Sequence, residues 1–296
     1  MTRFLVTGSA GLIGYQVTKD LVQQGDTVYA GYNKAEPNNG IPVKMDLLNQ
    51  EQLNEVIEKT KPSAIIHLAA QTNVDLCETQ KELALKMNAD ATKTIAKQAA
   101  KIKAFFVYVS TDYVFDGIKG LKKEEEKTNP VDYYGETKLQ GENAVRSFAS
   151  AWCIARTSTP YGMHKSKTSF PVWVAKNILE KNKINVVVDQ FTSPTYVPNL
   201  SRMLIEVATR QITGLIHLAG ATRISRYDMA KMVADKLNLD ESFLGAAHMS
   251  DMKWTAKRPM DSSLDVSKAA SILNEKPYTV EEGLDQFVKE FEVRSK

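Results

Sequence analysis

The residues best suited to chemistry are a tyrosine, a lysine and a threonine near the middle of the chain. A strand-like apolar run at 105–109 leads to Thr111, and a polar loop leads on to Tyr134-Gly-Glu-Thr-Lys138. Tyr134 and Lys138 are four residues apart and therefore share one face of a helix. A phenol beside an ammonium can donate a proton, and a nearby hydroxyl can hold a carbonyl against it. The pattern predicts Thr111, Tyr134 and Lys138 as a catalytic set that reduces a ketone with a bound hydride source.

The Tyr-x-x-x-Lys spacing needs its context. From average residue usage, about one match is expected by chance in a chain of this kind. The chain has four matches: Tyr15/Lys19, Tyr134/Lys138, Tyr161/Lys165 and Tyr227/Lys231. Of these tyrosines, only Tyr134 follows a strand-like run that ends in Ser-Thr-Asp. We therefore interpret the other three pairs as ordinary helix or loop surface.

The N-terminal segment predicts a dinucleotide site. A strand-like run at 3–7 precedes Gly8, Gly11 and Gly14, and an amphipathic run continues to residue 24. Glycines at this spacing let the backbone turn tightly beside a pyrophosphate, and the following helix supplies free N–H groups at its positive end. Backbone contacts to the cofactor are expected from Gly8, Ala10, Gly11, Leu12 and Ile13.

The residues after the second and third strands bear on the choice of cofactor. A carboxylate after the second strand, here 27–32, would hold the 2′-hydroxyl of NAD and repel a 2′-phosphate. Asn33 and Lys34 occupy this place. The sequence therefore favours NADP(H), with NAD(H) as the alternative. Asp46 and Leu47, which follow the third strand, suit a contact to the adenine, although Asp46 could also serve a turn or cap a helix.

Bulk composition indicates a globular cytoplasmic enzyme. The 296 residues are 43% hydrophobic and 25% charged, which is typical of soluble proteins, and the net charge of +3 gives no basis for nucleic-acid binding. We find no signal peptide and no apolar run that approaches the roughly 18 residues of a membrane span. The two cysteines are too few for a disulfide framework. The four histidines are scattered, so no metal site is expected.

Strand and helix signals alternate over the first half of the chain, which favours an α/β fold: a Rossmann-type doubly wound parallel sheet. We expect a dinucleotide-binding domain at 1–158, with 195–220 returning to it, and a smaller, interleaved C-terminal substrate lobe at 159–296. Strands are expected at 43–46, 64–68, 105–109, 152–155, 186–188 and 214–219. Helices are expected up to residue 60 from a cap at Asn49, and at 81–101, 170–180, 197–208, up to about 237 from a cap at Ser225, and at 280–291.

Three motifs together resemble a known family. They are Thr-Gly-x-x-Gly-x-x-Gly at 7–14, Ser-Thr-Asp-Tyr-Val-Phe at 110–115, and Tyr-Gly-x-x-Lys at 134–138. They resemble the extended short-chain dehydrogenase/reductases, and more narrowly the dTDP-4-dehydrorhamnose reductase branch. That branch also contains the non-catalytic regulatory subunit of methionine adenosyltransferase. The similarity extends over nearly the whole chain, through segments 72–78, 156–158, 189–190, 193–195 and 258–259.

The resemblance implies NADPH-dependent reduction of the 4-keto group of a nucleotide-linked deoxysugar. In it, Thr111 would orient the ketone, Tyr134 would donate the proton, and Lys138 would hold the nicotinamide ribose and lower the Tyr134 pKa. Ala69 and Ala70 would line the cofactor. Asn88 matches a family position that is structural or part of a proton path, or is simply a polar helix residue. Substrate contacts are expected from Val74, Thr111, Asp112, Tyr113, Gln190 and Arg258.

The chain also departs from the family. Thr159 stands where the bacterial reductases usually have a tryptophan, and Asp261 where an asparagine is common. A dehydratase is disfavoured because Asp112 is followed by Tyr113 instead of a second carboxylate. An epimerase and a non-catalytic NADP-binding regulatory subunit remain alternatives. The expected partner is a nucleotide sugar. A homo-oligomer is possible, but the sequence does not fix the number of subunits.

Overall fold

A parallel β-sheet forms the centre of the molecule. The computed structural model describes residues 2–295, and in this part seven strands form one sheet in the order β11-β6-β5-β4-β1-β2-β3. Every neighbouring pair is parallel, which confirms the Rossmann-type fold. The strands are β1 (Arg3–Thr7), β2 (Thr27–Tyr32), β3 (Ile41–Lys44), β4 (Ala64–His67), β5 (Phe105–Thr111), β6 (Trp152–Thr157) and β11 (Gly214–His217).

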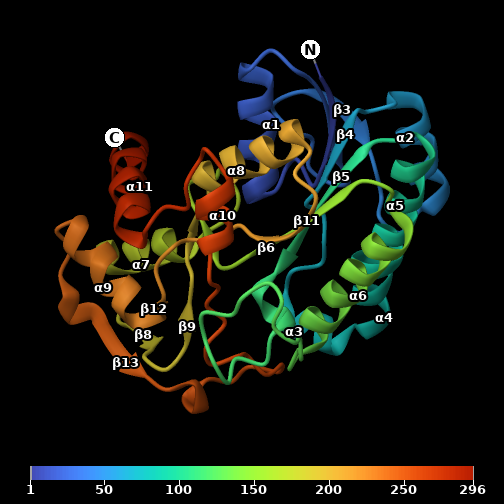
Figure 1. Cartoon of the computed structure of the whole chain (residues 1–296). Coiled ribbons are helices and arrows are strands. Elements are labelled where there is room, and N and C mark those ends of the chain that lie inside the picture. Colours follow the sequence, from blue (N-terminus) through green and yellow to red (C-terminus); the bar gives the residue numbers. More distant parts are fainter. Residues whose placement is uncertain (1, 296) are drawn as a thin grey trace.

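Helices cover both faces of the sheet, and this explains the continuous apolar runs of its central strands. Every residue of β4 and β5 is buried, as expected for a parallel sheet without a solvated face. One face carries α1 (Leu12–Gln23), α8 (Val197–Arg210) and α10 (Ser267–Ile272). The other carries α2 (Gln50–Thr60), α5 (Ala91–Lys101) and α6 (Tyr133–Phe148) (Figure 1).

A second, smaller lobe has its own apolar core. Its helices are α7 (Phe170–Leu179), α9 (Arg226–Lys236) and α11 (Val280–Ser295), and they lie together beside the sheet (Figure 1). Six short strands complete it in three two-stranded pairs. These pairs are β7 (Pro160–Tyr161) with β10 (Thr195–Tyr196), β9 (Phe191–Thr192) with β12 (Ile224–Ser225), and β8 (Ile184–Val187) with β13 (Leu244–Ala247).

The chain passes between the lobes more than once. After α8, strand β11 pairs with β6 at the edge of the main sheet. A later segment returns to α3 (Val74–Thr79), where Asp75 accepts the N–H groups of Thr255 and Ala256. The Asp75 carboxylate also pairs with Arg258, with Nη2 and Oδ2 3.0 Å apart. Contacts between parts of the chain that are distant in sequence thus join the two lobes.

Some elements differ in extent from the sequence expectation. The helix expected at 81–101 is three pieces: α4 (Lys81–Leu85), a π-helical turn at Lys86–Asp90, and α5. β5 and β6 each extend two residues further than expected because their ladder continues through Thr111 and Thr157. β3 ends at Lys44, before Asp46. The cap at Asn49 is confirmed, since its side chain accepts the Gln52 N–H at 3.0 Å.

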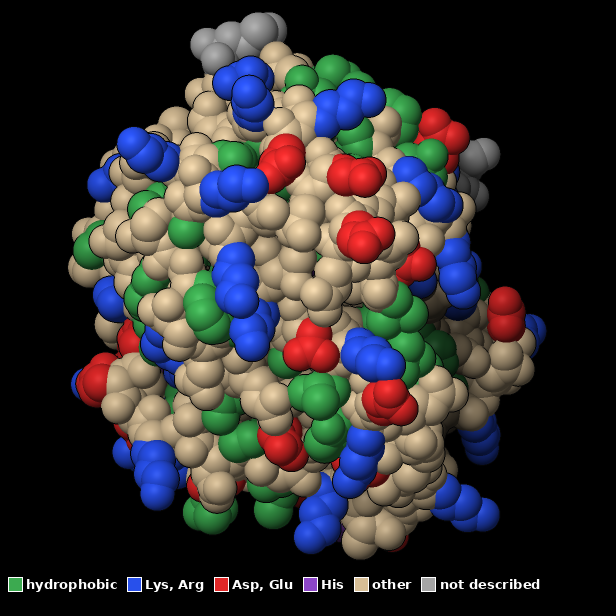
Figure 2. Space-filling model, turned by 90° about the vertical axis from the view of Figure 1, so that its right-hand side faces the viewer, with side chains coloured by type: hydrophobic (Ala, Val, Ile, Leu, Met, Phe, Trp, Pro, Cys, Tyr) green, Lys and Arg blue, Asp and Glu red, His purple; other side chains and the backbone are tan. Residues whose placement is uncertain are grey.

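The surface carries charged side chains of both signs (Figure 2), and the two cysteines lie in the interior. Figure 2 shows a face on which lysine and arginine side chains are interspersed with acidic ones. Within residues 2–295, no helix is both long enough and apolar enough to cross a bilayer. Cys77 and Cys153 are buried free thiols.

Candidate active site

The glycine turn is shaped by close backbone contacts. Gly8 has φ +67°, a left-handed conformation that glycine adopts without strain, and a side chain there would meet the Ala69 backbone N at 2.9 Å. A Cβ on Gly14 would lie 2.1 Å from the Gly8 carbonyl oxygen. The Gly11 N–H donates to that same oxygen at 2.9 Å. The turn therefore brings bare backbone to the carboxyl edge of β1.

The first turn of α1 lacks a side-chain cap. Its N-cap is Gly11, and no side chain accepts the first N–H groups of Leu12 and Ile13. By contrast, Asn49 caps α2 and Asp132 caps α6. Free N–H groups at a positive helix end suit an anionic ligand such as a pyrophosphate. Together with the crowded glycines, they fit a dinucleotide.

The loop after β4 is fastened to the end of β1. Thr7 Oγ1 accepts the N–H groups of Leu68 and Ala69, both at 3.1 Å, and lies 2.7 Å from His67 Nδ1. Burial lowers the pKa of His67 to about 3, and the Lys138 charge acts in the same direction. The neutral imidazole links β4 to the end of β1, where Ala69 lies beside Gly8 of the glycine turn.

The residues expected at the adenosine end differ in exposure. Asn33 and Lys34 are exposed at the end of β2. Asp46 Oδ1 accepts the Leu48 N–H at 3.0 Å, so this carboxylate stabilises the turn after β3. Leu47 is buried. The sequence analysis missed Lys44, which the β2–β3 register places beside Tyr32; its ammonium donates to the Asn33 carbonyl and lies 5.3 Å from the Tyr32 ring centroid.

The start of α6 is set by a cap and a close approach. Asp132 Oδ1 accepts the Gly135 N–H at 2.8 Å. A Cβ on Gly135 would lie 2.2 Å from the carbonyl oxygen of Tyr113, in the 3₁₀ turn Asp112–Val114. Glycine at this position therefore lets α6 lie directly against the end of β5, next to Tyr134. Burial raises the pKa of Asp132 to about 6, and its Oδ2 has no hydrogen-bond partner.

Thr111 and Tyr134 meet at this point. Burial raises the pKa of the Tyr134 phenol well above its ordinary value of 10, while a hydrogen-bond interaction with the Thr111 side chain acts in the opposite direction. The nearby Asp112 charge raises the pKa further. The direction differs from the lowered pKa expected from Lys138, because within the protein alone desolvation is the larger effect. The phenol is thus kept protonated.

Lys138 is nearly buried and turned toward β5. Its Nζ donates to the Val109 carbonyl at 2.8 Å and lies 4.1 Å from the centroid of the Tyr108 ring. Burial lowers the pKa of Lys138 to about 7, and the Glu142 carboxylate, one helical turn further on, acts against this. The ammonium is therefore held by one hydrogen bond and an aromatic face on the floor of the site.

Asp112 lies beneath the site. It is 3% exposed and accepts three hydroxyl groups: Thr111 Oγ1 at 2.9 Å, Ser158 Oγ at 2.7 Å and Ser262 Oγ at 2.6 Å. Burial raises its pKa, and the three hydroxyls oppose that shift. Asp112 was expected to contact substrate. In the structure its carboxylate lies against three protein hydroxyls and fixes the Thr111 side chain, and contact with substrate stays a prediction.

The residues expected to contact substrate differ in their surroundings, and Tyr113 packs against Tyr134. Its ring meets Tyr134 edge-on at 5.9 Å between centroids, and Arg258 is among the charges that act on its phenol. Val74 begins α3 and is partly buried, whereas Gln190 is 4% exposed, with its carbonyl accepting the Arg226 N–H. Arg258 is paired with Asp75, as described above.

Thr159 and Asp261 are the two positions at which the chain departs from the family. Thr159 adopts φ +41° directly after β6, a left-handed conformation that is rare for a β-branched residue. Asp261 pairs with Arg223, with Nε and Oδ2 2.7 Å apart, and its Oδ1 accepts the Ser263 hydroxyl at 2.6 Å. Both of these partners of the Asp261 carboxylate, Arg223 and Ser263, belong to the C-terminal segment 159–296.

Asn88 lies in the π-helical turn and is buried. Its amide donates to Thr137 Oγ1 and to the Gln71 carbonyl, both at 3.0 Å, and its oxygen accepts the Gln71 N–H at 2.8 Å. Asn88 thus joins the loop after β4 to the Tyr134 helix, and the structural interpretation of this residue fits these contacts.

Sequence reasoning missed several residues near the site. Arg226, at the start of α9, carries a charge that acts on both Tyr113 and Asp112. Ser262 reaches Asp112 from 150 residues away. Asp132 had a visible signal, since it stands three residues before Gly135 at a helix start. Arg226 and Ser262 had none, because only the folded chain brings them to β5.

Comparisons with known proteins agree with this geometry. The family model for the RmlD substrate binding domain matches residues 2–293. The probable low-salt glycan biosynthesis reductase of Haloferax volcanii is 30% identical over 94% of this chain and 95% of its own. The mouse methionine adenosyltransferase 2 subunit beta is 32% identical over 91% of this chain and 82% of its own.

Solved structures give the same result. The dTDP-4-dehydrorhamnose reductase of Bacillus anthracis, in complex with NADP, has a TM-score of 0.88 at 28% identity, covering 98% of this chain and 99% of its own. A hypothetical dTDP-4-dehydrorhamnose reductase from Sulfolobus tokodaii is 37% identical, with a TM-score of 0.86, covering 95% and 98%. The match over nearly every residue and the shared fold establish that the chain belongs to the RmlD substrate-binding domain family of extended short-chain dehydrogenase/reductases.

Proposed function

We propose that this protein is an NADPH-dependent reductase of the 4-keto group of a nucleotide-linked deoxysugar, like dTDP-4-dehydrorhamnose reductase. The observation that carries the proposal is the placement of Thr111 at the carboxyl end of β5 and of Tyr134 in the first turn of α6, which Gly135 lets approach the Tyr113 carbonyl. In open α/β sheets, ligands bind at this edge. The glycine turn after β1 opens onto the same edge.

NADP(H) is the favoured cofactor, with NAD(H) as the alternative. Gly8, Gly11 and the uncapped N–H groups of Leu12 and Ile13 would hold the pyrophosphate. Ala69 and Ala70 would line the nicotinamide side, and Leu47 the adenine. When bound, the cofactor supplies the hydride.

The protein's own residues would supply position and a proton. Tyr134 would donate its phenolic proton to the ketone oxygen, and Thr111, fixed by Asp112, would hold that oxygen in reach. A phenol with a raised pKa stays protonated at neutral pH, as an acid must before the reaction. The Lys138 ammonium would then hold the ribose and stabilise the phenolate that remains.

The substrate would lie between the lobes. Arg258 and Arg226 place two guanidinium groups around Tyr113, and such groups suit the diphosphate of a nucleotide sugar. We assign cofactor binding to 1–158 with 195–220, and substrate binding mainly to 159–296. Val74 and Gln190 would contribute to the walls of the substrate site.

A substrate screen tests the proposal. The purified protein is incubated with NADPH and a panel of nucleotide-linked 4-keto sugars, while NADPH oxidation is followed by its absorbance. We expect stoichiometric NADPH consumption and an alcohol at C4 of one sugar. Interconversion of two sugars without net NADPH consumption would instead identify an epimerase.

A regulatory role is the second candidate, favoured by the similarity to the mouse methionine adenosyltransferase beta subunit. A protein of that kind would bind NADP(H) in the same cleft and form a complex with a methionine adenosyltransferase. Stable co-purification with such an enzyme, together with no reduction of any keto sugar in the panel, would support this role.

A further inference from the structure

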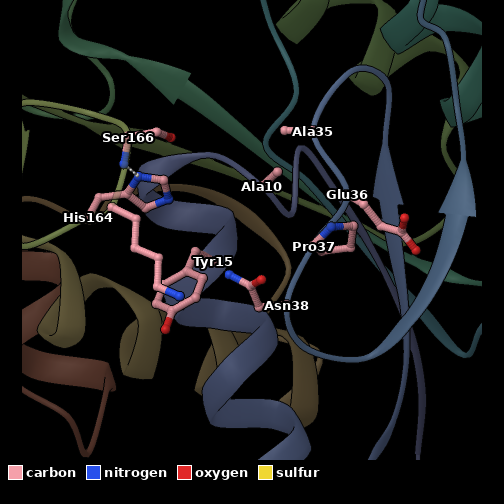
Figure 3. A pocket seen from close by; sticks show the side chains of 9 residues that line it. Ala10, Tyr15, Ala35, Glu36, Pro37, Asn38, His164 and Ser166 are labelled. Carbon is pink, nitrogen blue, oxygen red and sulfur yellow. Dashed lines mark hydrogen bonds between the residues drawn. The ribbon is translucent and has the colours of Figure 1, made fainter.

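A cavity lies where the second lobe meets the glycine turn (Figure 3). On the nucleotide-binding side it is lined by Ala10, by Tyr15 of α1 and by segment 35–38 after β2. The opposite wall is segment 164–166, which follows β7 in the second lobe. In a Rossmann-type fold, the residues after β2 lie beside the adenosine ribose. The cavity is therefore placed at the ribose 2′ position.

The positive charge in the lining of this cavity comes from the second lobe. Ala10 and Ala35 contribute no polar side chain. Lys34 and Lys165 are both exposed, but Lys34 does not line the cavity. The lysine that lines it is Lys165. Glu36 is the lining carboxylate, and in Figure 3 its side chain points away from His164 and Tyr15. A phosphate group requires cations and hydrogen-bond donors, so the side of the cavity formed by the second lobe is the one suited to it.

Segment 164–167 is held against the nucleotide-binding domain. His164 Nδ1 accepts the N–H groups of Ser166 and Lys167, both at 3.1 Å, which closes a tight turn. The His164 ring also meets Tyr15 edge-on, with 5.5 Å between centroids and an interplanar angle of 88°. These contacts join the turn to α1 across the two lobes. Lys165 is therefore carried by a segment whose place beside the glycine turn is set.

We propose that segment 164–166 of the second lobe binds the 2′-phosphate of NADP(H), with Lys165 as its cation, and so selects NADP(H) over NAD(H). The inference rests on the proposed function, because it requires a dinucleotide at the glycine turn. It assigns cofactor discrimination to the lobe that also binds the substrate, instead of to Lys34 after β2. Docking of the second lobe and selection of the cofactor then depend on the same contact.

Calorimetric binding of two adenosine fragments tests the inference without turnover. The probes are adenosine 2′,5′-bisphosphate, which carries the 2′-phosphate, and 5′-AMP, which lacks it. The wild-type protein should bind the bisphosphate more tightly. Lys165→Ala should weaken bisphosphate binding by about tenfold, the effect of one charge-assisted hydrogen bond, and change 5′-AMP binding by less than about twofold.

Lys34→Ala is the matched control, since it removes the same charge from an exposed position outside the cavity. It should change bisphosphate binding by less than about twofold. A tenfold loss in Lys34→Ala with none in Lys165→Ala would overturn the inference, as would equal binding of both probes by the wild type. Either result leaves the reductase proposal standing if NADPH still binds. Failure of the wild type to bind NADPH at all would contradict both.

Discussion

Glu142 and Arg156 form a buried bidentate ion pair directly below the candidate active site. Arg156 Nε and Nη2 each donate to a Glu142 carboxylate oxygen at 2.8 Å, and Glu142 also accepts the Ser110 hydroxyl at 2.7 Å. Glu142 lies one helical turn beyond Lys138. The pair ties α6, which carries Tyr134, to the ends of β5 and β6, and it lowers the Glu142 pKa although burial acts against this.

Removing one partner of this pair should be costly. Glu142→Ala leaves the Arg156 charge buried without its partner, so the free energy of unfolding should fall by about 3–5 kcal/mol. Glu136→Ala, on the exposed side of the same helix, should change it by about 1 kcal/mol or less. Urea unfolding of the two variants measures both values. Equal losses would show that the buried pair does not hold the helix in place.

Lys138→Met should affect both binding and rate. The ammonium is expected to contact the ribose and to stabilise the phenolate, so the variant should raise the KM for NADPH and lower kcat, each by about tenfold or more. Steady-state kinetics at saturating sugar substrate separate the two effects. A loss confined to kcat would argue against the ribose contact.

Asp132 should make stability depend on pH. Its pKa is raised from 3.8 to about 6 in the folded protein, so the folded state binds this proton more tightly than the unfolded state does. Stability is therefore lost as the pH rises from about 4 to about 6, by at most about 3 kcal/mol. Asp132→Asn keeps a side-chain acceptor for the helix cap and removes the buried charge.

Relative to wild type, Asp132→Asn should thus gain stability between pH 4.5 and pH 8. Urea unfolding at the two pH values measures the difference. The same relative stability at both pH values would mean that Asp132 titrates normally in the folded protein.

The glycine turn allows a graded test. In Gly14→Ala the new Cβ would lie 2.1 Å from the Gly8 carbonyl oxygen, so the turn must move. We expect a loss of about 1–3 kcal/mol in stability and of measurable NADPH binding. In Gly11→Ala the nearest atom is that same oxygen at 3.1 Å, so the effect on stability should be smaller. Thermal melts and calorimetry compare the two variants, and an equally stable, NADPH-binding Gly14→Ala would contradict the assigned geometry.

Local patterns predicted the sheet and the helix that carries Tyr134, because apolar runs and caps act over a few residues. The same patterns could not predict that Asp112 turns inward, since its partners Ser158 and Ser262 are distant in sequence. The π-helical turn at Asn88 likewise depends on Gln71 and Thr137. Side-chain pKa values also could not be predicted from the sequence. For Tyr134, tertiary packing sets the balance between burial, which raises the pKa, and the Thr111 side chain, which lowers it.

The most direct test of the account is the turnover of Tyr134→Phe with NADPH and a dTDP-4-keto sugar. The variant lacks the phenolic proton but retains the ring that packs against Tyr113. Loss of a general acid predicts that kcat falls by about 100-fold or more, while NADPH binding stays within about twofold of the parent. Turnover within about threefold of the parent would show that Tyr134 is not the acid, and the account of this site would be wrong.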